Sequence, residues 1–216
     1  MQALLWPDWL QEQFGLEGDA DALWQLVRAQ QLPPNPWWDP ARYRALHPDV
    51  AASGDDPLEH YLRFGWREQR STGSGLGGVA AFTADERDWL EVLVWPDWYL
   101  AQLPAALRAG LEPSEAAEHY LRLGVMAGWD PNPLFRTRYY GRANPDLLAA
   151  GCCLLLHYVR FGEQEGRRCH PRLLLRRAEL QQWLRGDAPP GWPVLAPDTC
   201  GWKRQQQLHH WAEQEV

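Results

Sequence analysis

Internal repetition is the feature of this sequence that most constrains its fold. Residues 38–70 and 135–167 align without a gap. Both stretches begin with an aromatic residue, continue through Tyr, Pro-Asp and Gly, and close on His-Tyr-X-Arg-Phe-Gly. Units of about 35 residues cannot bury an apolar face alone, so their copies must stack on one another. The repetition therefore predicts a short array of small stacked units.

Two weaker copies complete the pattern. Residues 95–129 keep the same spacing as far as Gly110 and then carry three extra residues before His119. The chain opens with a worn copy, residues 6–36, whose first four letters, Trp-Pro-Asp-Trp, recur at 95–98. We therefore expect about four units, produced by the duplication of a two-unit block.

Each unit is expected to fold as helix–turn–helix. Asp39 precedes Pro40, which places a capping side chain before a proline at the first helical position. Gly54 is expected to end the first helical segment in a left-handed conformation, and the second helix begins near Pro57. The position of a helix C-cap is taken in the three clearer copies by Gly65, Gly124 and Gly162.

The predicted fold class is all-α, a short array of helical repeats with a helical C-terminal cap. We assign residues 1–72 to the first repeat pair, 73–80 to a Gly/Ser linker, and 81–171 to the second pair with its lead-in helix. Residues 172–216 depart from the repeat and are expected to form a helical cap or a docking segment for a partner. The sequence leaves open whether the two pairs form one array or two lobes.

Charge and apolar content disfavour several classes of function. The formal net charge is −7, whereas nucleic-acid binding generally requires a clustered basic face, so no nucleic-acid partner is expected. No apolar run approaches the roughly 20 residues of a membrane span, and the N-terminus lacks the features of a signal peptide. We therefore predict a cytoplasmic protein without a membrane span.

Metal and acid–base chemistry are also disfavoured. The histidines His60, His119 and His157 recur at one repeat position, and equivalent positions lie on successive units instead of converging on one point. A repeated structural bond, for example to a neighbouring carbonyl, is the favoured interpretation. The cysteines lack the CxxC spacing of a zinc site; they are Cys152, Cys153, Cys169 and Cys200. No catalytic residue, metal or cofactor is predicted.

Tryptophan is the residue type with the strongest functional interpretation. The chain contains 14 Trp, and flat aromatic faces offer sugars and partner side chains a large contact area. Most are expected in the core, whereas Trp37 and Trp66 are expected to be exposed, because an adjacent aromatic or glycine takes the inward place. The candidate binding residues are Trp37, Trp66, Trp129, Arg63, Arg122 and Arg160.

The combined motif resembles a known class of bacterial repeats. An aromatic-Asp-Pro-x-x-Tyr start, an Asn/His-Pro-Asp step and a His-Tyr-Leu/Val-Arg-x-Gly end are similar to the tandem repeats that flank glycosyltransferase domains in bacterial surface-polysaccharide enzymes. The resemblance covers roughly residues 5–171 and is closest in the second and fourth copies. It implies a helical module that accompanies glycosyltransfer without being the seat of catalysis.

These observations predict a non-catalytic binding module. The first interpretation is an adaptor with a protein partner, for which a glycosyltransferase is a candidate, in bacterial surface-polysaccharide assembly. The first alternative is a carbohydrate-binding module that uses exposed Trp. The second alternative is an enzyme fragment related to glycosyltransferases, which would require a pocket with converging carboxylates.

Overall fold

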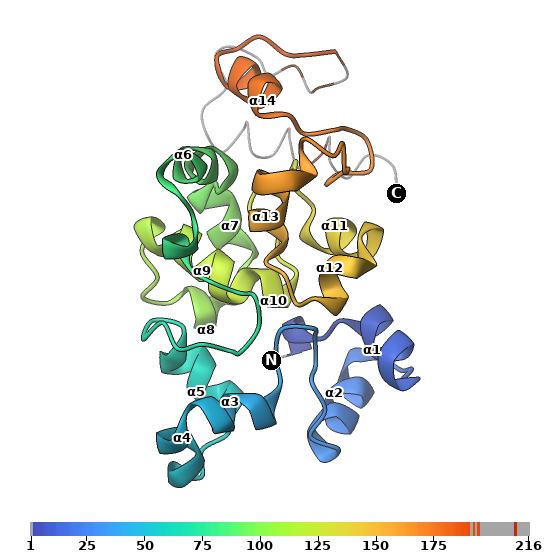
Figure 1. Ribbon diagram of the computed structural model, residues 1–216, viewed down its shortest axis with the longest axis vertical. Helices are drawn as coiled ribbons and strands as arrows, with labels where there is room; N and C mark the ends of the chain where they lie inside the picture. Colours follow the sequence, from blue (N-terminus) through green and yellow to red (C-terminus); the bar gives the residue numbers. More distant parts are fainter. Residues whose placement is uncertain (1, 191, 193, 195–209, 211–216) are drawn as a thin grey trace.

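The computed structural model describes residues 2–190, 192, 194 and 210, and this part of the chain is all-α, as the sequence predicts. No β-strand occurs among the described residues, in which only three isolated bridges form. Figure 1 shows the helices of the first quarter at one end of the longest axis and α14 (Arg177–Leu184) at the other. The remaining helices lie between them.

Short helices with local start and stop signals form the first part of the chain. They are η1 (Gln2–Leu4), α1 (Pro7–Phe14), α2 (Ala20–Ala29), α3 (Pro40–Leu46), α4 (Pro48–Ser53) and α5 (Pro57–His60). Asp19, Asp39 and Asp56 accept hydrogen bonds from backbone N–H groups in the first turns of α2, α3 and α5. Gly54 follows α4 with φ +77, which is the predicted left-handed cap.

The second part of the chain begins with the lead-in helix α6 (Ala84–Leu93). Thr83 and Glu86 form a reciprocal capping box at its start. The elements that follow are α7 (Pro96–Gln102), α8 (Ala105–Arg108), α9 (Ala116–His119), α10 (Val125–Ala127), α11 (Thr137–Ala143), α12 (Pro145–Ala149) and α13 (Leu154–His157). Two 3-10 turns, η3 (Val79–Ala81) and η4 (Pro113–Glu115), precede α6 and α9.

The Tyr-X-Arg-X-Gly part of the repeated motif forms a π-helical turn in all three of its copies. These turns are η2 (Tyr61–Gly65), η5 (Tyr120–Gly124) and η6 (Tyr158–Gly162), and they continue α5, α9 and α13. The prediction that their glycines are left-handed C-caps is therefore wrong, because Gly65, Gly124 and Gly162 have right-handed helical backbone.

Close packing explains these glycines instead. A Cβ atom at Gly65 would lie 2.5 Å from the Tyr43 hydroxyl, and one at Gly124 would lie 2.7 Å from the Tyr99 hydroxyl. Real side chains do not approach so closely, so each glycine leaves room for a tyrosine of an earlier helix, which is α3 for Gly65 and α7 for Gly124.

That tyrosine also bonds the recurrent histidine. The hydroxyl of Tyr43, Tyr99 or Tyr140 lies 3.2, 2.6 or 2.9 Å from the Nδ1 atom of the histidine in the same unit. The histidines in these bonds are His60, His119 and His157. The bond is internal to the fold, with a tyrosine hydroxyl in place of the carbonyl partner that we expected.

A second tyrosine in each motif links its π-helical turn to the next segment of the chain. The Tyr61 hydroxyl donates to the Arg122 carbonyl at 3.1 Å, and the Tyr120 hydroxyl lies 2.9 Å from Thr137 Oγ1. The Tyr158 hydroxyl donates to the carbonyl of Leu175, beyond the last motif. All three tyrosines are buried, so these bonds join segments within the core.

The two halves of the chain share one continuous core. A single cluster of buried apolar residues extends from Leu4 to Trp192. The segment that composition suggests is a flexible linker contacts both halves, because Arg42 donates to the Gly73 carbonyl at 3.1 Å and Gly75 donates to the Gly151 carbonyl at 2.9 Å. The two halves therefore share the main core, and a smaller separate cluster packs α1 against α2.

The C-terminal part is described only in its first half. The helix expected over 172–184 is shorter, since α14 begins at Arg177, and its Trp183 stacks on Trp95 at 5.9 Å between ring centroids. The polar helix expected from Trp202 lies outside the described residues.

Candidate functional site

The tryptophans predicted to be exposed are buried. Trp37 is 0% exposed and Trp66 is 4% exposed, so that prediction is wrong for both. The Trp37 indole lies edge-on to Trp6 at 5.0 Å and donates to the Cys152 carbonyl at 2.8 Å. The exposure prediction failed because it considered each residue against its sequence neighbours, whereas Trp37 packs against segments far away in the sequence.

Trp66 and Trp129 come together around one buried histidine. His119 lies edge-on to Trp66 at 4.8 Å and parallel to Trp129 at 6.3 Å. Burial lowers the pKa of His119 to about 4, the guanidinium of Arg67 contributing in the same direction, so the ring is neutral at pH 7. This cluster is therefore a hydrophobic contact between segments distant in the sequence, and among its three rings only Trp129 is partly exposed.

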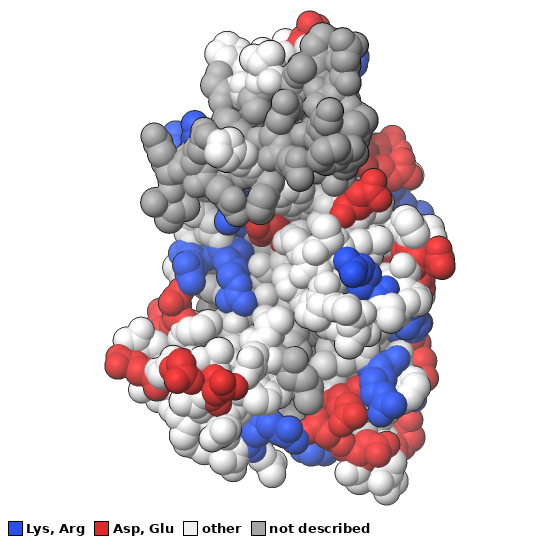
Figure 2. Space-filling model, turned by 180° about the vertical axis from the view of Figure 1, so that it is seen from behind, with Lys and Arg blue, Asp and Glu red and all other residues white. Residues whose placement is uncertain are grey.

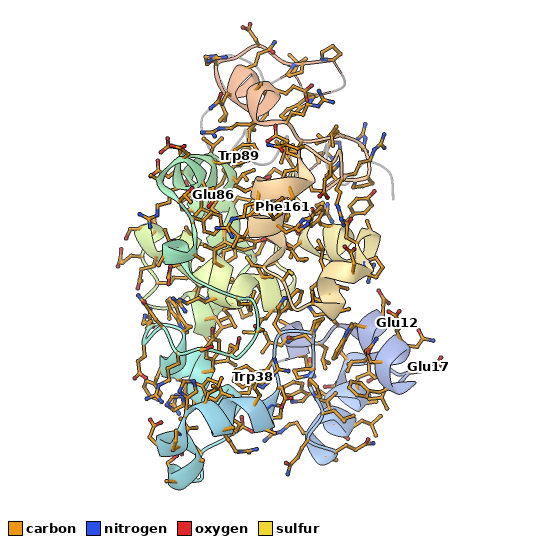
Figure 3. All side chains as sticks on the ribbon, in the orientation of Figure 1. Glu12, Glu17, Trp38, Glu86, Trp89 and Phe161 are labelled. Carbon is orange, nitrogen blue, oxygen red and sulfur yellow. The ribbon has the colours of Figure 1, made fainter. Side chains whose placement is uncertain are left out.

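The three candidate arginines do not converge on one ligand. Arg63 is exposed and pairs with Glu59 at 3.3 Å, while Arg122 is buried and pairs with Glu118. Arg160 on η6 pairs with Glu86 on α6 at 2.7 Å, and this ion pair holds the pKa of Glu86 down at about 2. Figure 3 shows Glu86 and Trp89 in the same region as Phe161. Each arginine is thus paired within the chain.

An open groove lies between α2 and the α3–α5 region in the described part of the chain. Its volume is about 170 Å³. α2 contributes Trp24 and Arg28 to the lining, while α3 contributes Arg44. The floor includes the buried ring of Trp38, which Figure 3 shows beside α3. Prolines form much of the remaining wall; they are Pro34, Pro40 and Pro57.

Charged groups at the groove differ in whether they have partners. Arg28 and Asp56 form an ion pair at 3.5 Å, and Asp56 also caps α5. The side chain of Arg44 is only partly exposed and makes no hydrogen bond, ion pair or stacking contact with any described residue. The other arginines of the described residues are either exposed or engaged in such a contact. Arg44 is therefore a partly buried cation available for an external anion.

A smaller hollow of about 110 Å³ lies between α1 and the α11–α12 region. Its two cations are already used internally, and Glu12 adds an exposed carboxylate to the lining. Arg142 pairs with Asp8, and Arg138 donates to the Leu5 and Ala127 carbonyls at 3.0 Å and lies 5.0 Å from the Trp6 ring. The groove beside α2 is therefore the stronger candidate. Figure 2 shows acidic and basic side chains intermingled over the rear face of the molecule.

The sequence analysis missed the residues of this groove. Trp24, Arg28 and Arg44 lie in the worn first copy and in a helix whose other residues follow the repeat. Comparison of each copy with its duplicate would have shown charged residues where the duplicate has apolar ones. A repeat motif identifies residues that recur, whereas this groove is lined by residues that do not recur.

Among the described residues, no group of three His, Cys, Asp or Glu side chains is arranged to hold a metal ion. None of the helices in the described ranges is both long and apolar enough to cross a bilayer. Comparisons of the chain with protein-family models, with curated proteins and with solved structures gave no significant match.

Proposed function

We propose that this protein is a non-catalytic binding module built as an array of four helical units. The equivalent tyrosine–histidine bonds in three units support the array, as does the matching of Asp49–Arg70 with Asp146–Arg167. The recurrent polar residues are used in these internal contacts, which leaves them unsuited to chemistry on a substrate.

The observation that carries a binding function is the groove beside α2. It combines a partly exposed indole, Trp24, with Arg44, a partly buried cation that has no partner in the described chain. Aromatic and arginine side chains in concave, partly apolar sites are typical of binding surfaces.

The resemblance of the repeat motif supports a role for this module in bacterial surface-polysaccharide assembly. We propose that it acts as an adaptor, with a glycosyltransferase or another polysaccharide-assembly protein as its partner and the cytoplasm as its location. Carbohydrate binding through Trp37 and Trp66 is no longer part of this proposal, since both rings are buried.

Capture of partners by the immobilised full chain tests the adaptor role. The expected result from a lysate of the source organism is a polysaccharide-assembly protein that is retained by the wild type and by Arg63→Glu but lost with Arg44→Glu. Arg63 is the matched control, because it is an exposed arginine on η2 away from the groove. Capture that the two variants affect equally, or no protein of this class, would overturn the proposal.

A further inference from the structure

The chain contains an internal comparison for its own groove. Residues 24–70 and 121–167 correspond without a gap at a separation of 97 positions, as between Tyr43 and Tyr140. We call the contact of α2 and the 30–40 loop with α3 and α5 the first junction. The second junction is the equivalent contact of residues 121–137 with α11 and α13.

The turns that follow the first helical segment of the two junctions are matched, although α2 is a regular α-helix and its counterpart includes the π-helical turn η5. Asn35 donates to the Leu4 carbonyl and Asn132 donates to the Leu93 carbonyl, while the Asn35–Trp38 and Asn132–Phe135 bridges are equivalent. The turn before each asparagine has a residue with positive φ, Gln31 at 52° and Gly128 at 69°. Gln31 thus adopts a left-handed backbone conformation, which is unfavourable for a residue other than glycine, and the first junction has the same turn as the second.

The side chains that fill the two junctions are different in kind. Arg28 corresponds to Val125 and Trp24 corresponds to Leu121, both of which are 0% exposed. Asp56 corresponds to Cys153, which is 3% exposed. The second junction is therefore closed and apolar.

Arg44 marks the clearest difference. Its counterpart is Gly141, where a Cβ atom would lie 3.0 Å from the ring of Trp6. The indole of Trp6 thus packs against α11 at Gly141, the position in the sequence repeat that corresponds to Arg44 on α3. An ordinary packing requirement would favour the apolar solution that the same backbone already uses. The charged lining of the first junction indicates a ligand.

The charges of the lining restrict the ligand. Arg28, Arg44 and Asp56 sum to one positive charge, and that charge is the guanidinium of Arg44, which pairs with no other described residue. This balance matches a monoanion such as a carboxylate, whereas a dianionic phosphate would be repelled by Asp56.

The rest of the lining restricts the ligand further. The guanidinium of Arg28 can donate hydrogen bonds, the carboxylate of Asp56 can accept them, and the neutral amide of Gln31 can do both. Together they can pair with several hydroxyls. Trp24 offers an aromatic face for a flat apolar surface. The wall prolines lack N–H groups, and no strand edge is present in the described part, so an extended peptide would find few main-chain donors.

We propose that the first junction binds a sugar residue that carries a carboxylate, a uronic acid, with its carboxylate on Arg44 and its ring on Trp24. This inference rests on the proposed function of the chain as a binding module and names the ligand of its groove.

Calorimetric titration of the full chain with methyl glucuronide and with methyl glucoside tests this inference. The two probes differ only in the carboxylate. The expected result is binding of the glucuronide at least about tenfold tighter than the glucoside, since a charge-assisted hydrogen bond supplies the difference. Arg44→Met should remove this preference, Arg44→Lys should retain part of it, and Arg63→Met should leave it intact.

Folding does not obscure the outcome, because the Arg44 side chain makes no hydrogen bond, ion pair or ring contact with a described residue that its removal could break; the unfolding midpoint checks this. Equal binding of the two sugars, or a preference that survives Arg44→Met, would overturn the inference. Tighter binding of inorganic phosphate or of an acidic proline-containing peptide would also overturn it. Capture of a protein partner through Arg44 without any glucuronide binding would reject the sugar and leave the adaptor role standing.

Discussion

At the scale of single residues, the tyrosine–histidine hydrogen bond occurs at three positions that differ in burial. His119 is 1% exposed, whereas His60 and His157 are partly exposed and can exchange the tyrosine for water. An unpaired polar atom costs most where water cannot replace the lost partner. The bond of His119 to Tyr99 should therefore contribute more to stability than its counterparts.

Removal of the tyrosine hydroxyl tests this difference. Tyr99→Phe should lower the free energy of unfolding by about 1–3 kcal/mol, because the buried Nδ1 atom of His119 is left without a partner. Tyr43→Phe is the matched control and should cost less than about 1 kcal/mol, since water can reach His60. Urea unfolding measures both, and equal losses would contradict the role of burial.

His119 should also make stability depend on pH. Its folded pKa of about 4 lies below the value of 6.5 for an unfolded histidine, so the unfolded chain binds the proton first as the pH falls. His119 therefore destabilises the fold progressively from about pH 6.5 to 4. Asp130 acts in the opposite direction, because burial raises its pKa to about 6 and its protonation favours the folded state.

Replacement of the histidine isolates its contribution. In His119→Gln, the slope of unfolding free energy against pH near pH 5 should be less positive than in the wild type by about one proton. Denaturant titrations across that range provide the slope. A slope unchanged by the substitution would show that His119 is not held neutral in the fold.

At the scale of secondary-structure elements, local signals were predictable and the π-helical turns were not. Asp39 and Gly54 act where the sequence places them, since a cap depends on the residues beside it. Gly124 is the residue type expected at a helix C-cap, but its backbone is right-handed helical. Glycine is needed there because a tyrosine on another helix, α7, packs closely against it. Such a cause is not visible in a local pattern.

A methyl group at Gly124 tests this reason. Gly124→Ala should destabilise the protein by about 1–3 kcal/mol through overpacking, although alanine is the better helix former. In the Tyr99→Phe background the cost should be smaller but still present, because the hydroxyl 2.7 Å from the new Cβ atom is gone while Tyr120 Cδ2, at 2.6 Å, remains. Equal costs in the two backgrounds, measured by urea unfolding, would place the conflict elsewhere.

At the scale of the whole molecule, the sequence predicted the helical class and left the relation of the two halves open. The shared core settles that relation, and contacts such as Trp37 to Cys152 cross between the halves. The candidate site was the least predictable part. Its position depends on which duplicate of a junction stays open, and the packing of Trp6 against Gly141 and the open groove at Arg44 show this only in three dimensions.

A shared core predicts one cooperative unfolding transition. Tryptophan fluorescence and far-UV circular dichroism should give the same midpoint in urea. Trp37→Phe removes the indole hydrogen bond to Cys152 and should move that single midpoint to lower urea. Two separated transitions, or a variant in which only one probe shifts, would show that the halves unfold independently.

The central claim is that the first junction is the binding site, and the indole resonances of the protein test it most directly. The chain has 14 tryptophans, each with its own indole N–H signal in a ¹H–¹⁵N spectrum, and Trp24→Phe identifies the signal of Trp24. On titration with methyl glucuronide, the account predicts that the Trp24 signal shifts most and that Arg44→Met abolishes the shift. A Trp24 signal that does not move, or a larger shift at Trp129 in the second junction, would contradict it.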